Sequence, residues 1–123
     1  MDTTEKLYHM EIGLPEGFEK PVGRVRVSYG KHARKEAFED RYGCIKLPSF
    51  INFHNFNVIE VGMMGGKVSK ILFRGELDET RDLCIVLMPT GMEGVWFAKT
   101  VWVNLNNDQH KTLNVTRYEM VGN

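Results

Sequence analysis

The residues most able to do chemistry stand in one stretch, VWFAKTVWVNLNNDQHKT, which spans residues 95–112. Lys99 and Thr100 interrupt an apolar run typical of a β-strand, and His110 follows this run after an Asn/Asp-rich loop. A buried, unpaired ammonium is too costly to persist, so Lys99 must reach a carboxylate or the sheet rim, lose its proton, or extend its charged end to water over a packed stem. Asn and Asp favour turns that can aim His110 back at the strand. We therefore predict that Lys99, Thr100 and His110 converge on an anion.

A second group of cations lies on the segment KVSKILFR, residues 67–74. Lys70 and Arg74 share one face of a strand there, because side chains alternate along a strand. An open sheet face that carries cations near the rings of Trp96 and Trp102 can bind phosphates and stack bases. The alternative interpretation is a solvated face over which the long side chains lie.

The histidines and cysteines do not have the spacing of a metal site. The four histidines stand at positions 9, 32, 54 and 110, and the two cysteines are forty positions apart. We therefore expect no metal, and the chain carries no sequence signature of a bound cofactor. His32 falls in the first turn of a predicted helix, where the helix dipole disfavours the protonated ring and suits a neutral imidazole acting as a base.

Length and composition indicate one globular domain, residues 1–123. Hydrophobic residues make up 42% of the chain and charged residues 26%, and the formal net charge is zero. Residues 20–46 hold eight bases against three acids, which fits either a local phosphate-binding face or a helix whose charges pair with neighbours. No apolar run approaches the roughly 20 residues of a membrane span. We expect a soluble cytoplasmic protein that does not bind a membrane, and the sequence leaves its oligomeric state open.

The elements that must position these residues are short strands, one helix and then four longer strands. This order predicts an α+β fold with one main helix packed on a four- to five-stranded antiparallel meander sheet, preceded by short N-terminal strands. The strand 83–89 is apolar on both faces and should be central. The helix is predicted over 31–42, and the strands over 6–12, 24–28, 57–63, 67–77, 83–89 and 95–104, with a further edge strand within 112–121.

Regular alternation along the last long strand predicts which side chains share a face. One face would carry Val95, Phe97, Lys99, Val101 and Val103, and the other Trp96, Ala98, Thr100, Trp102 and Asn104. Lys99 would then stand among four apolar side chains.

The order of a helix followed by a meander resembles the small ribonuclease toxins related to RelE and the tRNA-cutting colicins. The resemblance rests on KHARKEAFEDRYG, KVSKILFR and AKTVWVNLNNDQHKT, and it covers roughly residues 30–113. It implies an endoribonuclease that needs no metal. His32 or His110 would take the ribose 2′-hydroxyl proton and the other histidine would protonate the leaving oxygen. The residues carried over by the resemblance are His32, Lys70, Arg74, Lys99, Thr100 and His110.

A second hypothesis is a non-enzymatic protein-binding module. The compact, Met-rich, single-domain chain is similar in style to small phage accessory proteins, which often bind and block a host protein. Trp96 or Trp102 would then anchor the interface, since tryptophan dominates interface hot spots. The partner is thus RNA in one hypothesis and a host protein in the other. An enzyme needs His110 in a cleft with cations, whereas a binding module leaves it in an exposed loop.

Overall fold

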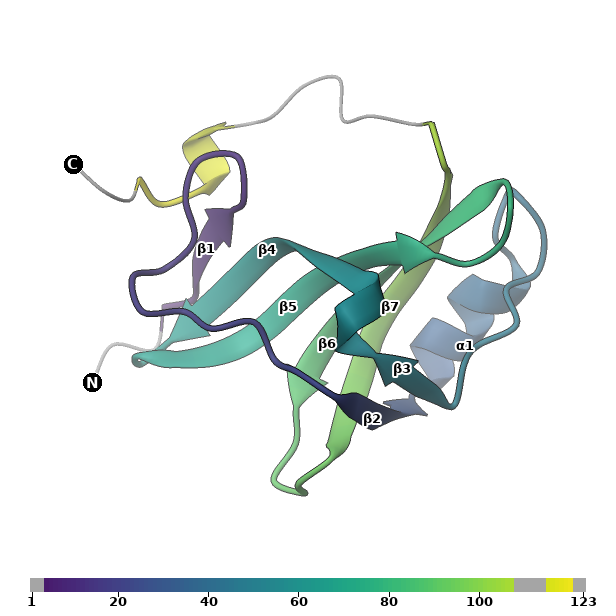
Figure 1. Ribbon diagram of the computed structural model, residues 1–123, viewed down its shortest axis with the longest axis horizontal. Coiled ribbons are helices and arrows are strands. Elements are labelled where there is room, and N and C mark those ends of the chain that lie inside the picture. The colour runs from purple at the N-terminus through teal and green to yellow at the C-terminus, as the bar shows by residue number, and fades with distance from the viewer. Residues whose placement is uncertain (1–3, 108–114, 121–123) are drawn as a thin grey trace.

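The computed structural model describes residues 4–107 and 115–120. The strands in these residues are β1 (Lys6–His9), β2 (Arg24–Tyr29), β3 (Phe50–Asn52), β4 (Phe56–Met64), β5 (Lys67–Glu76), β6 (Arg81–Pro89) and β7 (Val95–Leu105). The helices are α1 (Lys31–Phe38), η1 (Phe53–Asn55) and η2 (Val115–Arg117), of which η1 and η2 are 3₁₀ turns. Figure 1 shows α1 at one end of the sheet and β1 with η2 at the other. No described helix is long and apolar enough to cross a membrane.

The seven described strands form a single mixed sheet in the order β1-β4-β5-β6-β7-β2-β3. β4 to β7 form an antiparallel meander, but β2 runs parallel to β7. The predicted fold, a main helix on a four- to five-stranded antiparallel meander, is therefore wrong. The N-terminal strands enlarge the sheet by pairing with β4 and β7, and the helix has only eight residues. These pairings join segments far apart in the chain, which local periodicity does not encode.

The C-terminal residues also differ from the predicted edge strand within 112–121. In the described part of this segment, η2 spans Val115–Arg117. After η2, one backbone hydrogen bond joins the chain to the sheet, from Glu119 N–H to the Leu7 carbonyl of β1 at 2.8 Å. This end of the chain therefore lies against β1 without extending the sheet.

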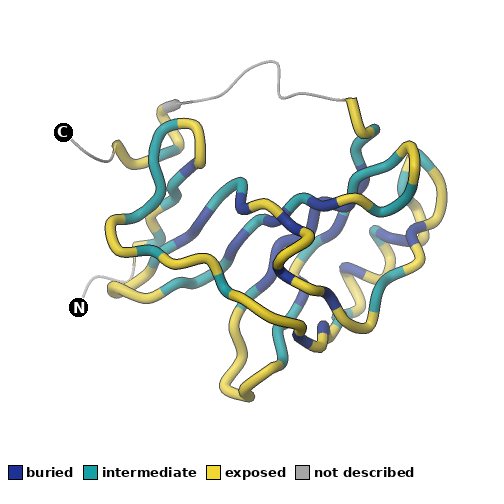
Figure 2. The backbone as a smooth tube through the Cα atoms, viewed as in Figure 1, coloured by how far each residue is buried: buried dark blue, intermediate teal, exposed yellow. Residues whose placement is uncertain are grey.

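The sheet curls around the core, because η1 connects its last strand, β3, directly to β4 on the opposite side. Phe53 of η1 is fully buried inside the curl. Its ring centroid lies 5.1 Å from that of Phe73 on β5 and 5.5 Å from that of Trp96 on β7. Figure 2 shows the buried residues gathered along the middle strands, with exposed residues in the loops around them.

The central position of β6 was predicted correctly. The five consecutive residues Leu83–Leu87 are all buried, as a strand covered on both faces requires. Leu83, Ile85 and Leu87 belong to the main core, whereas Cys84 and Val86 point to the opposite face.

β7 contains a bulge at Lys99. Its neighbours Ala98 and Thr100 lie opposite consecutive residues of β6, so Lys99 has no partner in that ladder. A bulge adds one residue to a strand and resets the alternation of its side chains. Ala98 and Val101 consequently both lie in the core, and Lys99 is exposed. The predicted alternation, which placed Lys99 on the same face as Val101, is wrong for this reason.

α1 protects the part of β7 that β2 leaves unpaired. The β2–β7 ladder ends at the pair Tyr29–Ala98, and the helix begins at Lys31. Beyond that point, Val101 N–H donates to Glu36 at 3.2 Å and Val103 N–H donates to Asp40 at 3.1 Å. Figure 1 shows α1 beside β7. The Glu36 and Asp40 carboxylates accept the N–H groups that the carbonyls of a neighbouring strand would otherwise accept. The observed helix is shorter than the predicted 31–42, and the Asp40 side chain lies beyond its end.

Candidate functional site

Most of the predicted site residues meet on what we call the outer face, the face of β4 to β7 that points away from the core. Cross-strand pairing aligns its side chains in rows. One row is Glu60, Leu72, Val86 and Thr100, and the next is Asn57, Arg74, Cys84 and Trp102. Lys70 on β5 and Phe97 on β7 lie beyond the first row, on the side opposite Arg74 and Trp102.

Thr100, Glu36 and His32 form a connected polar chain between β7 and α1. The Thr100 hydroxyl donates to the Glu36 carboxylate at 2.6 Å, and His32 Nε2 lies 3.4 Å from Glu36 Oε2. His32 and Glu36 are neighbours on the helix surface because they are four residues apart. The His32 side chain is 75% exposed, whereas that of Glu36 is 30% exposed. A half-buried carboxylate thus lies within ion-pair distance of an accessible imidazole, a pairing of groups that is common in acid–base sites.

Lys99 adds an exposed positive charge next to this chain. It makes no ion pair with any residue in the described part of the protein. Its field reaches the carboxylate of Glu5, which lies on the outer face against Ser69 and Lys70. Burial by itself raises the pKa of Glu5, but the hydrogen bonds from Ser69 and Lys70 and the charges of Lys70 and Lys99 outweigh it and lower that pKa. Lys99 is therefore directed toward the outer face.

Lys70 and Arg74 lie on the outer face as predicted, but both are ion-paired. Lys70 Nζ is 3.2 Å from Glu5 Oε1. Arg74 Nε donates to Asp82 at 2.8 Å, and its Nη2 donates to the Leu105 carbonyl at 3.1 Å. Arg74 thus links β5 to both β6 and β7, so an incoming phosphate would have to compete with its existing partners. At Lys99 a phosphate would not have to displace a described ion-pair partner.

The two tryptophans lie on opposite faces. Trp96 is half-buried and packs edge-on against Phe53 on the core side of the sheet. Trp102 lies on the outer face in the row of Arg74 and is half-buried. Cys84 lies between Arg74 and Trp102 in that row and is buried, and burial raises the pKa of its thiol to about 11. The thiol therefore stays protonated and serves as a small apolar side chain at neutral pH.

A second polar cluster, which the sequence did not indicate, lies at the β4 end of the outer face. Tyr118 OH donates to Glu60 Oε1 at 2.6 Å, and its ring meets the ring of His9 edge-on at 5.0 Å between centroids. His9 is 4% exposed, and its Nδ1 accepts the backbone N–H of Glu11 at 3.1 Å. Burial, followed by the bond to Glu60, raises the pKa of Tyr118 to about 12. Only the folded backbone brings these distant residues together.

Glu36 was also missed, although its spacing from His32 offered a signal. Residues four apart on a helix face one another, so the His-x-x-x-Glu spacing in KHARKEAF was readable as a pair. His110, the remaining member of the predicted set, lies outside the described residues. Within residues 4–107 and 115–120, no three or more His, Cys, Asp or Glu side chains are grouped so that they could hold a metal ion.

Comparison with known proteins adds no relative from which a role could be transferred. A scan against protein-family models finds no family that matches the chain, and searches of curated proteins and of solved structures likewise find no match. The chemistry of the outer face therefore rests on the contacts of its own residues.

Proposed function

We propose that this chain binds RNA on its outer face and cleaves it without a metal ion. The observation that carries the proposal is the Thr100–Glu36–His32 chain beside the unpaired Lys99. The chain supplies an accessible imidazole with a carboxylate beside it, and Lys99, the residue before Thr100 on β7, adds a cation without a described ion pair. General acid–base cleavage of a phosphodiester needs these three kinds of group.

The reaction follows from what each group can do. His32 takes the proton of a ribose 2′-hydroxyl, whose oxygen forms a bond to the adjacent phosphorus as the bond from phosphorus to the 5′-oxygen breaks. The leaving oxygen takes a proton from a second donor, for which His110 is the candidate from the sequence. The products are a 2′,3′-cyclic phosphate and a 5′-hydroxyl. Glu36 acts as a positioning residue for His32, and Lys99 neutralises charge on the phosphate oxygens.

RNA is favoured over other anions by the aromatic side chains on the same face. Trp102 and Phe97 lie on β7 on either side of Thr100, and both are half-buried. Aromatic rings stack on bases of any sequence, and cations beside them follow the phosphate backbone. Because the net charge is zero and Lys70 and Arg74 are already paired, we expect modest affinity that weakens with added salt.

The test compares RNA with DNA in the presence of EDTA. The purified chain should cleave a single-stranded RNA and leave the DNA of the same sequence intact, since DNA lacks the 2′-hydroxyl. His32→Ala should lower the cleavage rate by about 10²- to 10⁴-fold, the usual contribution of a general acid or base. His54→Ala is the matched control, because His54 is exposed on η1 and its side chain has no described partner.

The products separate this proposal from contamination by another ribonuclease. Cleavage should yield 2′,3′-cyclic phosphate ends, and the activity should fall in His32→Ala but not in His54→Ala. If the pure chain cuts none of a panel of RNAs, or if both variants cut equally well, the catalytic role of His32 is wrong.

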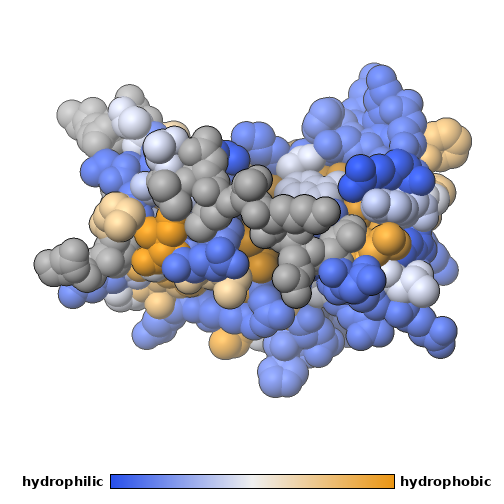
Figure 3. All heavy atoms as spheres, turned by 90° about the horizontal axis from the view of Figure 1, so that it is seen from above, coloured by the Kyte–Doolittle hydropathy of each residue, from blue (hydrophilic) through white to orange (hydrophobic). Residues whose placement is uncertain are grey.

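A protein-binding module is the second candidate, and exposed apolar side chains favour it. Phe38 on α1 is 77% exposed, and Val22 before β2 is 86% exposed. These residues lie on separate elements, and from above the hydrophobic surface forms small patches among hydrophilic side chains (Figure 3). Failure to cleave RNA, together with loss of a host-protein complex in Phe38→Ala or Trp102→Ala, would favour this candidate over the enzyme.

A further inference from the structure

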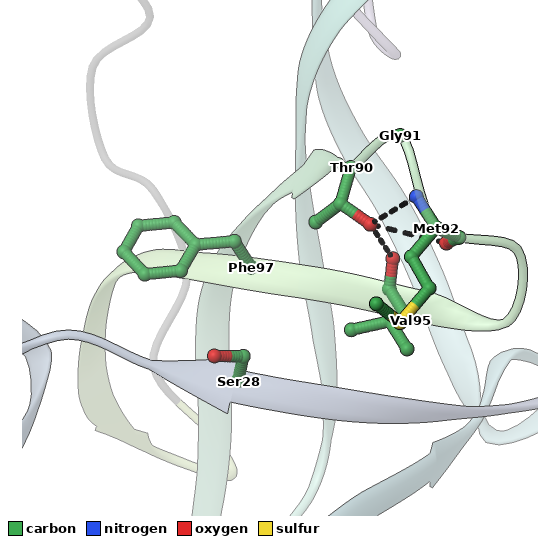
Figure 4. Close-up of a pocket in the computed structure, with 6 residues that line it drawn as sticks. All are labelled: Ser28, Thr90, Gly91, Met92, Val95 and Phe97. Atoms are coloured by element: carbon green, nitrogen blue, oxygen red, sulfur yellow. Dashed lines mark hydrogen bonds between the residues drawn. The ribbon is translucent and has the colours of Figure 1, made fainter.

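A cavity of about 520 Å³ opens at the β6–β7 turn, next to the end of β2. It is lined by Ser28, Thr90, Gly91, Met92, Val95 and Phe97 (Figure 4). Its volume lies in the range of small-ligand sites, and its lining is mainly aromatic and aliphatic with two hydroxyl groups. This combination suits a flat ring system with a polar edge.

Phe97 supplies an aromatic surface at one end of this cavity. It pairs with Ser28 of β2, and Figure 4 shows its ring on the side of Ser28 away from the turn. The ring packs against Gly30, where an added Cβ would come within 2.9 Å of the Phe97 Cζ atom. Phe97 is nevertheless only half-buried, so part of its ring is available for stacking.

The opposite wall is held in place by Thr90. Its hydroxyl donates to the Val95 carbonyl at 2.7 Å and accepts the Met92 N–H at 3.1 Å. These bonds close the turn and leave the Thr90 hydroxyl fully used. The Ser28 hydroxyl, by contrast, makes no hydrogen bond within the described ranges and the residue is exposed, so the hydroxyl is available to the polar edge of a ligand.

Two exposed cations flank the cavity. Arg26 lies beside Val95 in the β2–β7 ladder, and Lys99 follows Phe97 by two positions. Neither makes an ion pair with another described residue. Thr100, the β7 end of the His32 chain, lies three residues from Phe97, at most about 10 Å along the strand. An apolar ring site with a cation on either side, on the same strand as Thr100, has the layout of a single nucleotide and its two phosphates.

We propose that this cavity binds one unpaired base next to the scissile phosphate, so that the substrate is single-stranded RNA. The inference rests on the proposed function. The base stacks on Phe97, its polar edge meets Ser28, and its flanking phosphates face Arg26 and Lys99. A base within a duplex is paired and stacked, so it cannot enter the cavity without being pulled out.

Binding measured apart from cleavage tests this inference. The probe is a fluorescently labelled, single-stranded RNA of mixed sequence, titrated with protein carrying His32→Ala so that it stays intact. Adding Phe97→Leu, which keeps an apolar side chain but removes the ring, should weaken binding about 5- to 150-fold, the usual value of one base–aromatic stack. Phe38→Leu, at a phenylalanine exposed on α1, should bind as before. The RNA duplex of the same sequence should bind more weakly than the single strand.

A second measurement covers the case in which Phe97→Leu fails to fold. The same His32→Ala protein is titrated with an RNA whose bases are replaced by abasic sites, which should lose affinity to a similar extent. Equal binding of Phe97→Leu and its parent, of abasic and normal RNA, or of duplex and single strand would overturn the inference. Cleavage of RNA by the unaltered chain with no effect of Phe97→Leu would reject the base pocket alone. Weakened RNA binding in Phe97→Leu without any cleavage by the unaltered chain would reject the catalytic proposal and support the pocket.

Discussion

At the scale of single residues, Lys99 shows how one inserted position gives a strand a reactive surface. The bulge turns its ammonium to the exterior, while Ala98 and Val101 on either side remain in the core. The sequence indicated the cation within an apolar run. It did not indicate the bulge, because a bulge is a property of the pairing with β6 and not of β7 alone.

Replacing Lys99 by methionine should separate charge from packing. Lys99→Met keeps the unbranched stem and removes the charge, and no described ion pair is lost. We expect RNA cleavage to fall while the free energy of unfolding changes by less than about 0.5 kcal/mol, as is usual for a surface substitution. Cleavage rates and urea unfolding curves measure the two effects. Lys46→Met, at an exposed lysine after α1, should change neither. A parallel loss of stability and activity in Lys99→Met would contradict an electrostatic role.

The same scale shows how far the candidate site could be predicted. The resemblance carried over His32 and Thr100 as separate candidates, and the structure connects their side chains through Glu36, which was not predicted. Lys70 and Arg74 were expected as phosphate ligands, and they lie on the predicted face but in ion pairs. Residue type and alternation indicate which side chains share a face. They do not indicate which charges already have partners, since Glu5 lies just before β1 and Asp82 lies on β6.

At the scale of elements, α1 substitutes for a strand at the edge of the sheet. Unpaired edge groups invite pairing with another chain, and natural proteins cover such edges. Here Glu36 and Asp40 accept the N–H groups that β2 would have bonded had it continued. Ala33 and Ala37 are buried beneath the helix, and their small side chains let its axis approach β7 closely.

Removing the Asp40 carboxylate should therefore expose the edge of β7. Asp40→Ala deprives the Val103 N–H, and also the Tyr42 N–H, of its acceptor. We expect a loss of about 1–3 kcal/mol of stability and faster hydrogen exchange at the Val103 amide. Glu39→Ala, at an exposed neighbour with no described side-chain contact, is the control. Unchanged exchange at Val103 in Asp40→Ala would show that the helix does not protect this edge.

Element positions were largely predictable, whereas their partners were not. The predicted strands 67–77 and 95–104 match β5 and β7 to within one residue at each end. The Gly-Gly turn before β5 has positive φ at both glycines, as a hairpin of this kind requires. The predicted strand 24–28 corresponds to β2, but its parallel pairing with β7 was not predicted. Short strands have too few side chains to specify a distant partner, so this choice depends on the closed core.

At the scale of the whole molecule, the curl of the sheet depends on Phe53. This ring fills the space between β5 and β7 and is 1% exposed. Phe53→Ala should cost about 3–5 kcal/mol of stability, the usual loss for a buried phenylalanine. Phe38→Ala removes the same side chain from the surface of α1 and should cost far less. Denaturant unfolding of the two variants measures the difference. Similar losses would mean that the sheet does not close around Phe53.

The ends of the described chain also meet across the molecule. Tyr118 bonds to Glu60 on β4, and the next residue donates its backbone N–H to Leu7 on β1. These bonds join η2 to the edge of the sheet, where His9 is buried against the tyrosine ring. The Tyr118–Glu60 contact is also sensitive to alkaline pH, because a tyrosinate cannot donate to a carboxylate.

Tyr118→Phe should therefore reduce the loss of stability at alkaline pH. Burial and the bond to Glu60 raise the pKa of Tyr118 from 10.0 to about 12 in the folded protein. The hydroxyl therefore loses its proton more easily in the unfolded chain than in the folded one. The tyrosine's contribution is complete below pH 10 and disappears as the pH rises from about 10 to about 12. Tyr118→Phe should be less stable than the parent near pH 8 and approach it near pH 12, as urea unfolding at each pH would show. Burial also raises the pKa of Tyr29, but this residue is present in both proteins, so its contribution to stability cancels in the comparison. The control variant Tyr42→Phe should show the same dependence of stability on pH as the parent. A constant stability difference between Tyr118→Phe and the parent from pH 8 to pH 12 would show that the raised pKa of Tyr118 does not control stability in this pH range.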